Sequence, residues 1–456
     1  DARFQPRQDL SERRHVRLGE NAGCAWDRDG VIAKHNDALR LGPLSPARVL
    51  EPADGVELAD ALAAAAAAGE SVVLHGGGTL QHSANPPVRY DSAVLTTRLV
   101  AVHEYEPRDL TIGIGAGMTL ATLRRMLAEH HQVLPLDAPF PARATIGGTL
   151  ASGWAGPRRA TYGRSRDLLI GATVALTDGT LAVCGGMVVK NVTGYDLGKL
   201  YVGSQGTLGA IVRANFKVLP APPEQRLAIS TFEDDNRERV VAHVGGMTVP
   251  PVALLIRDGF LALRDAPRPE DIDFRPQIVA LFEGSESTVD RAMREYRSAL
   301  GAAGVAETRI VTGAAAGDGF QEVVDEYVAL AGAVSFTLLG RGLPADAPLR
   351  SERARTAFPS GGERGVSVET IANLLTGDVV ARVRAPAALD AQTLAAAGAA
   401  VRSAIGRAQL IAAHDAAVPH VDAWGETPST IATMRALKER FDPQNVLAPG
   451  RFVGAI

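Results

Sequence analysis

Three consecutive glycines, Gly76-Gly77-Gly78, form the first segment whose residue types could do chemistry, and they lie between His75 and Thr79. Because glycine has no Cβ, successive main-chain amides can turn toward one point and hold phosphate oxygens without a positive side chain. A plain turn is the alternative explanation for this run. The spacing is not the G-x-G-x-x-G of a dinucleotide-binding loop, so that type of site is not predicted here.

A second segment, from Thr145 to Gly153, combines the glycine pair Gly147-Gly148 with Ser152. Paired glycines among small residues form a wall that a flat ring can approach to van der Waals distance, and the short hydroxyl side chains add hydrogen-bond donors. The alternative is a helix start that packs tightly on a neighbouring element. Either way, the segment predicts close contact with its main chain.

Two further glycine-rich segments differ in what they predict. Residues 188–211 contain Lys190 and Lys199, two of the five lysines in the chain, which is suggestive of a site. Residues 113–117 read Gly-Ile-Gly-Ala-Gly, but Met118 stands where a dinucleotide-binding loop has its third glycine. We therefore expect a close strand-to-helix turn there, in which glycine provides a positive φ.

Motifs that other chemistries need are missing, since the sequence has no G-x-x-x-x-G-K-[ST], H-E-x-x-H, C-x-x-C or G-x-S-x-G. Kinase-like, zinc-hydrolase and serine-hydrolase functions are therefore disfavoured, and no metal site is predicted. The formal net charge of −4 gives no general attraction to nucleic acid. Cys24 and Cys184 are too few for a disulfide framework, so both are expected to be reduced. No apolar run reaches the ~18 residues of a membrane span.

The elements that position the first glycines follow from caps and apolar spacing. Asp54 is expected to cap a helix that Gly69 ends, and a buried strand follows at residues 71–74. A second unit combines a strand at residues 110–114 with a helix that Thr119 caps. This alternation predicts a βαβ-like opening with the three glycines directly after a strand.

The pattern changes after Val218, where prolines interrupt the chain and glycine becomes rarer. An α+β region is expected beyond this point, with helices on one face of an antiparallel sheet. The expected strands lie at residues 279–282, 336–339 and 379–383, and the expected helices at residues 288–300, 391–405 and 429–441.

In their order and spacing, these glycine segments resemble the FAD domain of the vanillyl-alcohol oxidase and p-cresol methylhydroxylase family, most closely the FAD-binding subunits of bacterial glycolate oxidases. Residues 437–452 also resemble the closing segment of that family. The resemblance implies a two-subdomain FAD-binding domain of the p-cresol methylhydroxylase type and an α+β cap, or substrate, domain with an antiparallel sheet. The implied limits are residues 1–44 for an N-terminal extension, 45–222 for the FAD-binding domain, 223–425 for the cap, and 426–456 for a segment that returns to the FAD domain.

The resemblance also implies which residues bind FAD. The pyrophosphate would contact the first segment, the flavin and ribityl chain the second, and the adenosine the third. The implied contacts are His75, Gly76, Gly77, Gly78 and Thr79, then Thr145, Gly147, Gly148, Ser152 and Gly153, and last Gly206 and Ile211.

Three positions depart from the family pattern. Thr79 stands where members with covalently attached flavin have a histidine, which implies noncovalent FAD. His75 stands where arginine is common, which weakens neutralisation of the phosphates. Ala448 replaces the asparagine of an Asn-Pro-Gly closing motif and loses its hydrogen bond.

No catalytic residue is predicted. Self-sufficient 2-hydroxyacid dehydrogenases of this group carry a pair of metal-binding histidines and a late Glu-His, an arrangement that the late residues His414, His420 and Glu426 do not reproduce. Oxidation of a 2-hydroxyacid needs a base for the hydroxyl proton and a cation for the carboxylate. The candidate cations are Arg341, Arg382 and Arg384, and the candidate bases are His414 and His420, with surface solvation as the alternative role.

The resemblance implies an FAD-dependent oxidoreductase that is the FAD-binding subunit of a glycolate-oxidase-like complex. It would hold noncovalent FAD and work with a second flavoprotein subunit and an iron–sulfur subunit on a small 2-hydroxyacid such as glycolate or D-lactate. The expected location is the cytoplasm, at the inner membrane through the complex. The alternatives are a self-sufficient FAD-dependent hydroxyacid or alcohol dehydrogenase or oxidase, and a structural subunit with a degenerate flavin site.

Overall fold

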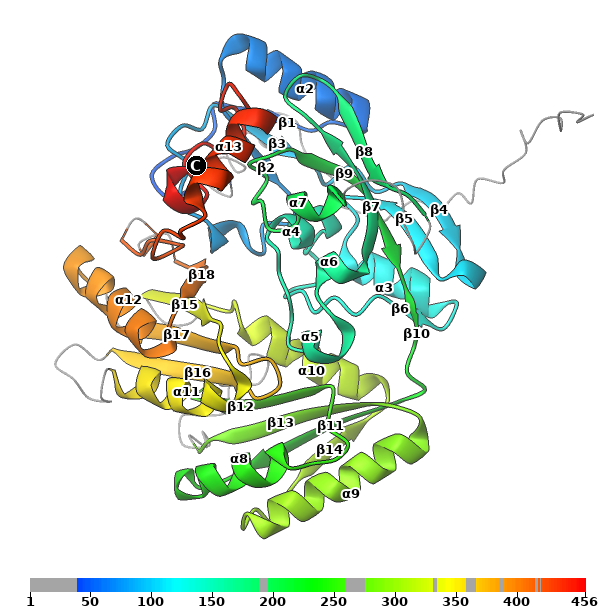
Figure 1. The fold of residues 1–456 in the computed structure, drawn as a ribbon, viewed down its shortest axis with the longest axis vertical. Coiled ribbons are helices and arrows are strands. Elements are labelled where there is room, and N and C mark those ends of the chain that lie inside the picture. The colour runs from blue at the N-terminus through cyan, green and yellow to red at the C-terminus, as the bar shows by residue number, and fades with distance from the viewer. Residues whose placement is uncertain are drawn as a thin grey trace, which may run out of the picture. The chain divides into compact units, whose positions relative to one another are not determined.

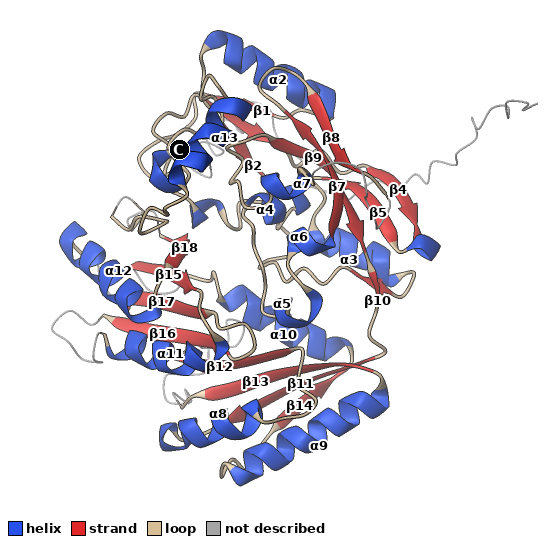
Figure 2. Cartoon of the chain, in the orientation of Figure 1, coloured by secondary structure: helices blue, strands red, loops and turns tan. Residues whose placement is uncertain are grey.

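The computed structural model describes residues 39–456 except 188–195, 260–274, 331–333, 358–365, 386–388, 415–416 and 419. Most of the predicted N-terminal extension therefore lies outside the described residues, as does Lys190. The residues expected to form the FAD-binding domain and its returning segment, 45–222 and 426–456, carry a three-stranded sheet, a five-stranded sheet and a two-stranded pair, and are called the FAD-side half below. The second half, within residues 223–425, is built on one large sheet (Figure 1, Figure 2). The domain limits expected from the sequence stay a prediction.

The first sheet is small and parallel. Strand β1 (Arg48–Leu50) pairs with β3 (Ser92–Leu95), which also pairs with β2 (Val72–His75), so that the order is β1-β3-β2. The connecting helix α2 (Gly55–Ala68) begins at Asp54, whose carboxylate accepts hydrogen bonds from two amides of the first turn, and ends at Gly69 with φ 67°. The predicted helix, both of its caps and the strand that follows are confirmed.

The second sheet is antiparallel and has five strands in the order β4-β5-β9-β7-β8. Several short helices connect or flank these strands. The strands are β4 (Val102–Glu106), β5 (Thr111–Gly115), β7 (Leu169–Ala175), β8 (Leu181–Gly185) and β9 (Ala210–Lys217), and the helices are α3 (Leu120–Ala128), α4 (Ile146–Ala151), α5 (Arg159–Tyr162), α6 (Ser165–Leu168) and α7 (Gly198–Tyr201). Two short strands, β6 (Gln132–Val133) and β10 (Leu219–Pro220), form a separate antiparallel pair.

The glycines at 113, 115 and 117 lie at the predicted strand-to-helix connection, but the reason given for them is wrong. None of the three has a positive φ. A Cβ on Gly115 would lie 2.1 Å from the main-chain oxygen of Leu99, and one on Gly117 would lie 2.1 Å from that of Thr96. The sequence therefore needs glycine here because two segments of main chain touch.

The second half contains an eight-stranded antiparallel sheet in the order β14-β11-β13-β12-β16-β17-β15-β18. The predicted strands and helices of this half are all present. The strands are β11 (Glu224–Thr231), β12 (Ala253–Asp258), β13 (Gln277–Gly284), β14 (Arg309–Thr312), β15 (Val334–Gly340), β16 (Ser367–Asn373), β17 (Val379–Ala385) and β18 (Ala408–Ala413), and the helices are α8 (Arg237–Gly245), α9 (Glu286–Ala302), α10 (Ala314–Glu326), α11 (Ala347–Thr356) and α12 (Ala391–Ile405).

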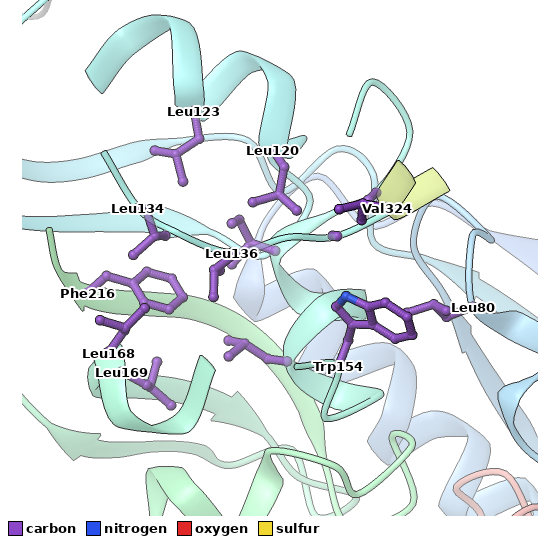
Figure 3. Packing of buried hydrophobic residues seen from close by; sticks show 14 of the residues in the cluster. Leu80, Leu120, Leu123, Leu134, Leu136, Trp154, Leu168, Leu169, Phe216 and Val324 are labelled. Carbon is purple, nitrogen blue, oxygen red and sulfur yellow. The ribbon is translucent and has the colours of Figure 1, made fainter. Parts of the chain in front are cut away.

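Helices cover both faces of this sheet, which corrects the expectation of helices on one face. Ala228 and Ile256 pack with α8 and α9, whereas Leu227 and Leu255, on the opposite face, join a core that includes α10. That second core continues into the FAD-side half, where it contains Leu120, Leu136, Trp154 and Phe216 together with Val324 of α10 (Figure 3). The sheet is therefore sandwiched between its outer helices and the FAD-side half.

The last segment of the chain returns to the first sheet. Helix α13 (Ile431–Phe441) leads to Leu447, which forms a parallel bridge with Val72 of β2. Val72 donates its amide to the oxygen of Val446 at 2.8 Å, and Ala448 donates to the oxygen of Val72 at 2.8 Å. Within the described residues, no helix is long and apolar enough to cross a membrane.

Candidate functional site

A cleft lies where the loop after β2, helix α4 and the closing segment meet. Its walls contain eleven of the twelve residues predicted to bind FAD. The lining residues are Leu74, His75, Gly76, Gly77, Gly78, Thr79, Leu80, Gln81, Thr96, Thr145, Gly147, Gly148, Ala151, Ser152, Gln205, Gly206, Gly209, Ile211 and Arg451.

The glycine run forms one wall because no larger residue fits there. A Cβ on Gly76 would lie 2.2 Å from the Thr145 hydroxyl, and one on Gly77 would lie 1.7 Å from the main-chain oxygen of Arg143. Gly78 has φ +71° and almost no neighbour around its Cβ position. Sequence analysis left open a plain turn or a phosphate-binding loop, and this crowded, cleft-facing arrangement favours the second.

The main-chain amides of residues 76–79 are available to a ligand. Within the part of the chain that the structure describes, none of them donates a hydrogen bond to another protein group. Thr96 anchors the start of the loop, since it donates its amide to the oxygen of His75 at 2.8 Å and its hydroxyl to the same oxygen at 3.1 Å. These four residues are half-buried or exposed, so water can reach their amides when no ligand is bound. Their arrangement suits a ligand with several acceptor oxygens.

Helix α4 forms the facing wall. It fits both predictions for the second glycine segment, a wall for a flat ring and a tightly packed helix start. Thr145 caps the helix by accepting a hydrogen bond from the amide of Gly148 at 3.3 Å. A Cβ on Gly147 would lie 2.9 Å from that of Ala116, so this glycine packs on its neighbour. A Cβ on Gly148 would meet only the Thr145 hydroxyl, at 3.1 Å, and Gly148 lines the cleft with Ser152. The segment is thus a tightly packed helix start with a smooth face on the cleft.

Gly153 is the predicted contact that does not line the cleft. It has φ +64°, and a Cβ there would lie 2.9 Å from the Cα of Gly203. Gly153 therefore joins the end of α4 to the third glycine segment behind the wall. Gly206 and Ile211 of that segment do line the cleft, and a Cβ on Gly206 would touch Leu74.

The charge of the cleft comes from the closing segment. Arg451 is 3% exposed and donates to the main-chain oxygen of Gln81 at 2.7 Å. Burial lowers the pKa of Arg451 to about 10, and the nearby Tyr90 hydroxyl opposes that shift. The ring of His75 contacts Tyr90, with Nε2 at 2.5 Å from Oη, and burial followed by the charge of Arg451 lowers its pKa to about 3. His75 is therefore neutral near pH 7, and Arg451 is charged.

Four polar residues that line the cleft were not predicted from the sequence, namely Arg451, Gln81, Thr96 and Gln205. The signal for Arg451 was present, since residues 437–452 were assigned to a returning segment. Its side chain was not assigned because the fold alone shows that this segment ends beside β2. Gln81, Thr96 and Gln205 come from connections without a recognisable motif.

The residues proposed from the sequence for substrate chemistry lie outside the cleft. Arg382 and Arg384 both contact Glu369, with oxygen–nitrogen distances of 2.5 Å. His414 accepts a hydrogen bond from the amide of Ser335 on its Nδ1 at 3.0 Å. The other two candidates, Arg341 and His420, do not line the cleft either. In the described residues, no group of three or more His, Cys, Asp and Glu side chains is arranged to hold a metal ion.

Comparison with known sequences identifies relatives of the FAD-side half. The family described as FAD binding domain matches residues 46–185. The glycolate oxidase subunit GlcE of Escherichia coli (strain K12) is 35% identical over 151 residues, which are 33% of this chain and 42% of GlcE. The glycolate oxidase subunit GlcD of Bacillus subtilis (strain 168) is 27% identical over 230 residues, 50% of this chain and 49% of GlcD. A D-lactate dehydrogenase of Archaeoglobus fulgidus is 31% identical over 172 residues, 38% of each chain.

These alignments span less than half the length of each relative. Solved structures extend the likeness over nearly the whole chain. An alkyldihydroxyacetonephosphate synthase superposes with a TM-score of 0.65 at 16% identity, covering 89% of this chain and 77% of its own. The structure of FgChi7B gives a TM-score of 0.65 at 15% identity, covering 92% and 94%. The predicted fold class is confirmed.

Proposed function

We propose that this chain, whose residues 46–185 form an FAD binding domain, is an FAD-dependent 2-hydroxyacid oxidoreductase that serves as the FAD-binding subunit of a glycolate-oxidase-like complex. The observation that carries the cofactor assignment is the cleft. The residues 76–79, whose main-chain amides donate to no protein group in the described chain, line it together with the buried Arg451. We infer that Gly76 to Thr79 bind the diphosphate noncovalently and that Thr145 to Ser152 lie along the ribityl chain and flavin.

The substrate class is inferred from the relatives. Their names give glycolate, D-lactate and D-2-hydroxyglutarate as substrates, and all three compounds are 2-hydroxyacids. When bound, FAD supplies a two-electron acceptor for the hydrogen on C2 of such an acid. This chain would hold the cofactor and would keep water from it with apolar residues of the cleft such as Leu74 and Ile211.

Dependence on a partner is inferred from the charges on the large sheet. The face of the sheet turned to the FAD-side half carries Arg382, but Glu369 forms a buried ion pair with it, and Ala329 accepts a further hydrogen bond. A second arginine on that face, Arg257, pairs with Glu326 at 3.0 Å. The positive charges of these arginines are already neutralised by carboxylates of the same chain. A substrate carboxylate would have to displace Glu369 or find its cation elsewhere, for which a second subunit is the simplest source.

One observation favours the self-sufficient alternative. Glu369 forms ion pairs with both Arg382 and Arg384, so one negative charge faces two positive charges, and the side chain of Arg384 is 34% exposed. The hydroxyl of Thr337, on the strand next to Arg382, is buried without a hydrogen-bond partner among the described residues. Arg384 and Thr337 would then be the groups that receive a substrate. This second candidate predicts turnover by the isolated chain.

Experiments on the purified chain alone distinguish the subunit function from the self-sufficient one. Purified chain should be yellow and should release FAD on acid denaturation. Under anaerobic conditions, glycolate or D-lactate should leave its flavin oxidised for the subunit proposal, and flavin reduction should require co-expressed flavoprotein and iron–sulfur subunits. Prompt bleaching by the isolated chain, lost in Arg384→Gln, would establish self-sufficiency instead. Protein that neither carries FAD nor binds added FAD would overturn both.

A further inference from the structure

Arg451 is a buried cation without an anionic partner. Its side chain comes from the end of the chain and is 3% exposed. The described residues provide it with one hydrogen-bond acceptor, the main-chain oxygen of Gln81 at 2.7 Å, and no carboxylate lies within 4.0 Å of it. A guanidinium carries five N–H donors. Most of its hydrogen-bonding capacity is therefore left for another group.

Such an arrangement is costly unless an anion completes it. A buried charge without a partner is strongly disfavoured, and proteins pair nearly all of them. The cost is visible in the lowered pKa of Arg451, for which burial is the main cause. The other buried arginines of the described chain have carboxylate partners, since Arg237 pairs with Asp258, Arg257 with Glu326 and Arg382 with Glu369. Among these buried arginines, Arg451 is thus the exception that a ligand would explain.

The groups around Arg451 point to the kind of anion. It lines the same cleft as Gly76, Gly77 and Gly78, whose amides are unpaired. His75 contributes no charge, because its pKa is about 3. Among the described lining residues, Arg451 is also the one Lys, Arg, Asp or Glu. A row of amide donors beside one buried guanidinium suits a phosphate or diphosphate.

We propose that Arg451 binds the diphosphate of FAD and supplies the positive charge that the neutral His75, next to the same glycines, does not supply. The proposal rests on FAD binding by the cleft and adds the residue that neutralises the cofactor. The neutral His75 then has a packing role, since its ring contacts Tyr90.

Arg143 is the competing candidate. Its guanidinium donates to the oxygen of Gly77 at 3.2 Å, so it also lies beside the glycine loop. Arg143 is exposed, however, and water and salt screen an exposed charge. A buried cation beside unpaired amides should contribute more. Arg143→Gln is therefore a matched control for Arg451→Gln, since both variants remove one arginine next to the same loop.

The test measures binding of three ligands to apoprotein by isothermal titration: FAD, ADP and riboflavin. Arg451→Gln should weaken FAD and ADP about 10- to 100-fold, as expected for a lost charge-assisted hydrogen bond. Riboflavin, which has no phosphate, should change less than about threefold. Arg451→Lys keeps the charge and should recover part of the loss, and Arg143→Gln should weaken FAD less than about threefold. Thermal unfolding of each apoprotein measures any loss of folding separately.

A double variant that moves the positive charge to position 75 tests whether the charge itself is what the diphosphate needs. His75→Arg in the Arg451→Gln background should raise FAD affinity about tenfold or more above that of Arg451→Gln alone. No recovery would contradict a role of Arg451 in neutralising the diphosphate. Equal weakening of riboflavin and FAD, or a larger loss in Arg143→Gln than in Arg451→Gln, would overturn a diphosphate role for Arg451. Failure of the unmodified chain to bind FAD would instead overturn the cofactor assignment, so the two outcomes are distinct.

Discussion

The cofactor cleft and the face of the large sheet handle charge in opposite ways. In the cleft, a buried arginine without a carboxylate partner lines the same space as residues whose amides bond no described protein group. On the sheet, buried arginines face carboxylates, as Arg382 faces Glu369 and Arg257 faces Glu326. An unpaired group is disfavoured until a ligand binds, whereas a compensated pair holds the fold together and resists displacement. The comparison suggests that this chain keeps a place for its cofactor and uses most of its other buried charges for structure.

The largest expected effect is on the cleft wall. Gly77→Ala places a Cβ 1.7 Å from the main-chain oxygen of Arg143, and neither side can move without shifting main chain. The variant should lose FAD binding by more than about 100-fold, measured as the flavin content of purified protein. Gly301→Ala in α9, where a Cβ meets nothing within 4 Å, is the control and should raise stability by up to ~1 kcal/mol. Normal flavin content in Gly77→Ala would contradict a crowded wall.

The next effect is on the sheet. Glu369→Gln removes the negative charge that Arg382 and Arg384 share, and breaking a buried pair on one side costs ~3–5 kcal/mol. The free energy of unfolding in urea should fall by that amount, with FAD affinity unchanged. Glu70→Gln, which removes an exposed partner of Arg48, should cost less than ~1 kcal/mol. If both variants cost the same, the sheet pairs are not structural.

A pH effect of intermediate size comes from His75. Its pKa is about 3 in the folded chain and ~6.5 when unfolded, so the unfolded state binds the extra proton first as the pH falls. Stability from this group is complete above pH 6.5 and declines below it, by about 2 kcal/mol between pH 7 and pH 5. Urea unfolding of apoprotein at both pH values should show this loss, and His75→Gln should lack it. An identical pH dependence in both proteins would show that His75 is not held neutral.

The smallest effect is on the link between the two regions. Gln409 of β18 donates its side-chain amide to the main-chain oxygen of Ser83, in the short 3₁₀ helix Gln81–Ser83 beside the cleft, at 2.9 Å. Gln409→Ala should lower the free energy of unfolding by ~0.5–1.5 kcal/mol, the usual contribution of one hydrogen bond. FAD affinity should stay within about threefold. A tenfold loss of FAD affinity would mean that the sheet helps to shape the cleft.

Much of the fold could be predicted because local signals agreed with it. Asp54 and Gly69 bound their helix through capping chemistry that does not depend on distant residues. The glycine segments were found through composition and were correctly grouped, except that Gly153 lies behind the wall. Contacts between residues far apart in the sequence could not be predicted. The need for Gly115 comes from the main chain of Leu99, and the pairing of Arg382 with Glu369 comes from strand register.

Arg451 shows the same limit most clearly. In a sequence rich in arginine, nothing marks one near the C-terminal end as special, because its burial depends on where the chain returns. The return was predicted, but the neighbour of its side chain was not. Sequence patterns identified what could bind the phosphates, and the folded chain was needed to find the charge.

The route of the closing segment has a consequence for how the protein is made. Arg451 contacts Gln81, a residue 370 positions earlier. At ~5–20 residues per second, synthesis takes roughly 20–70 s to pass from one to the other, and the N-terminal part folds during that interval. The glycine loop is therefore made well before the segment that carries Arg451. If Arg451 binds the diphosphate as proposed, full FAD affinity requires that this late segment has been made and has returned to β2.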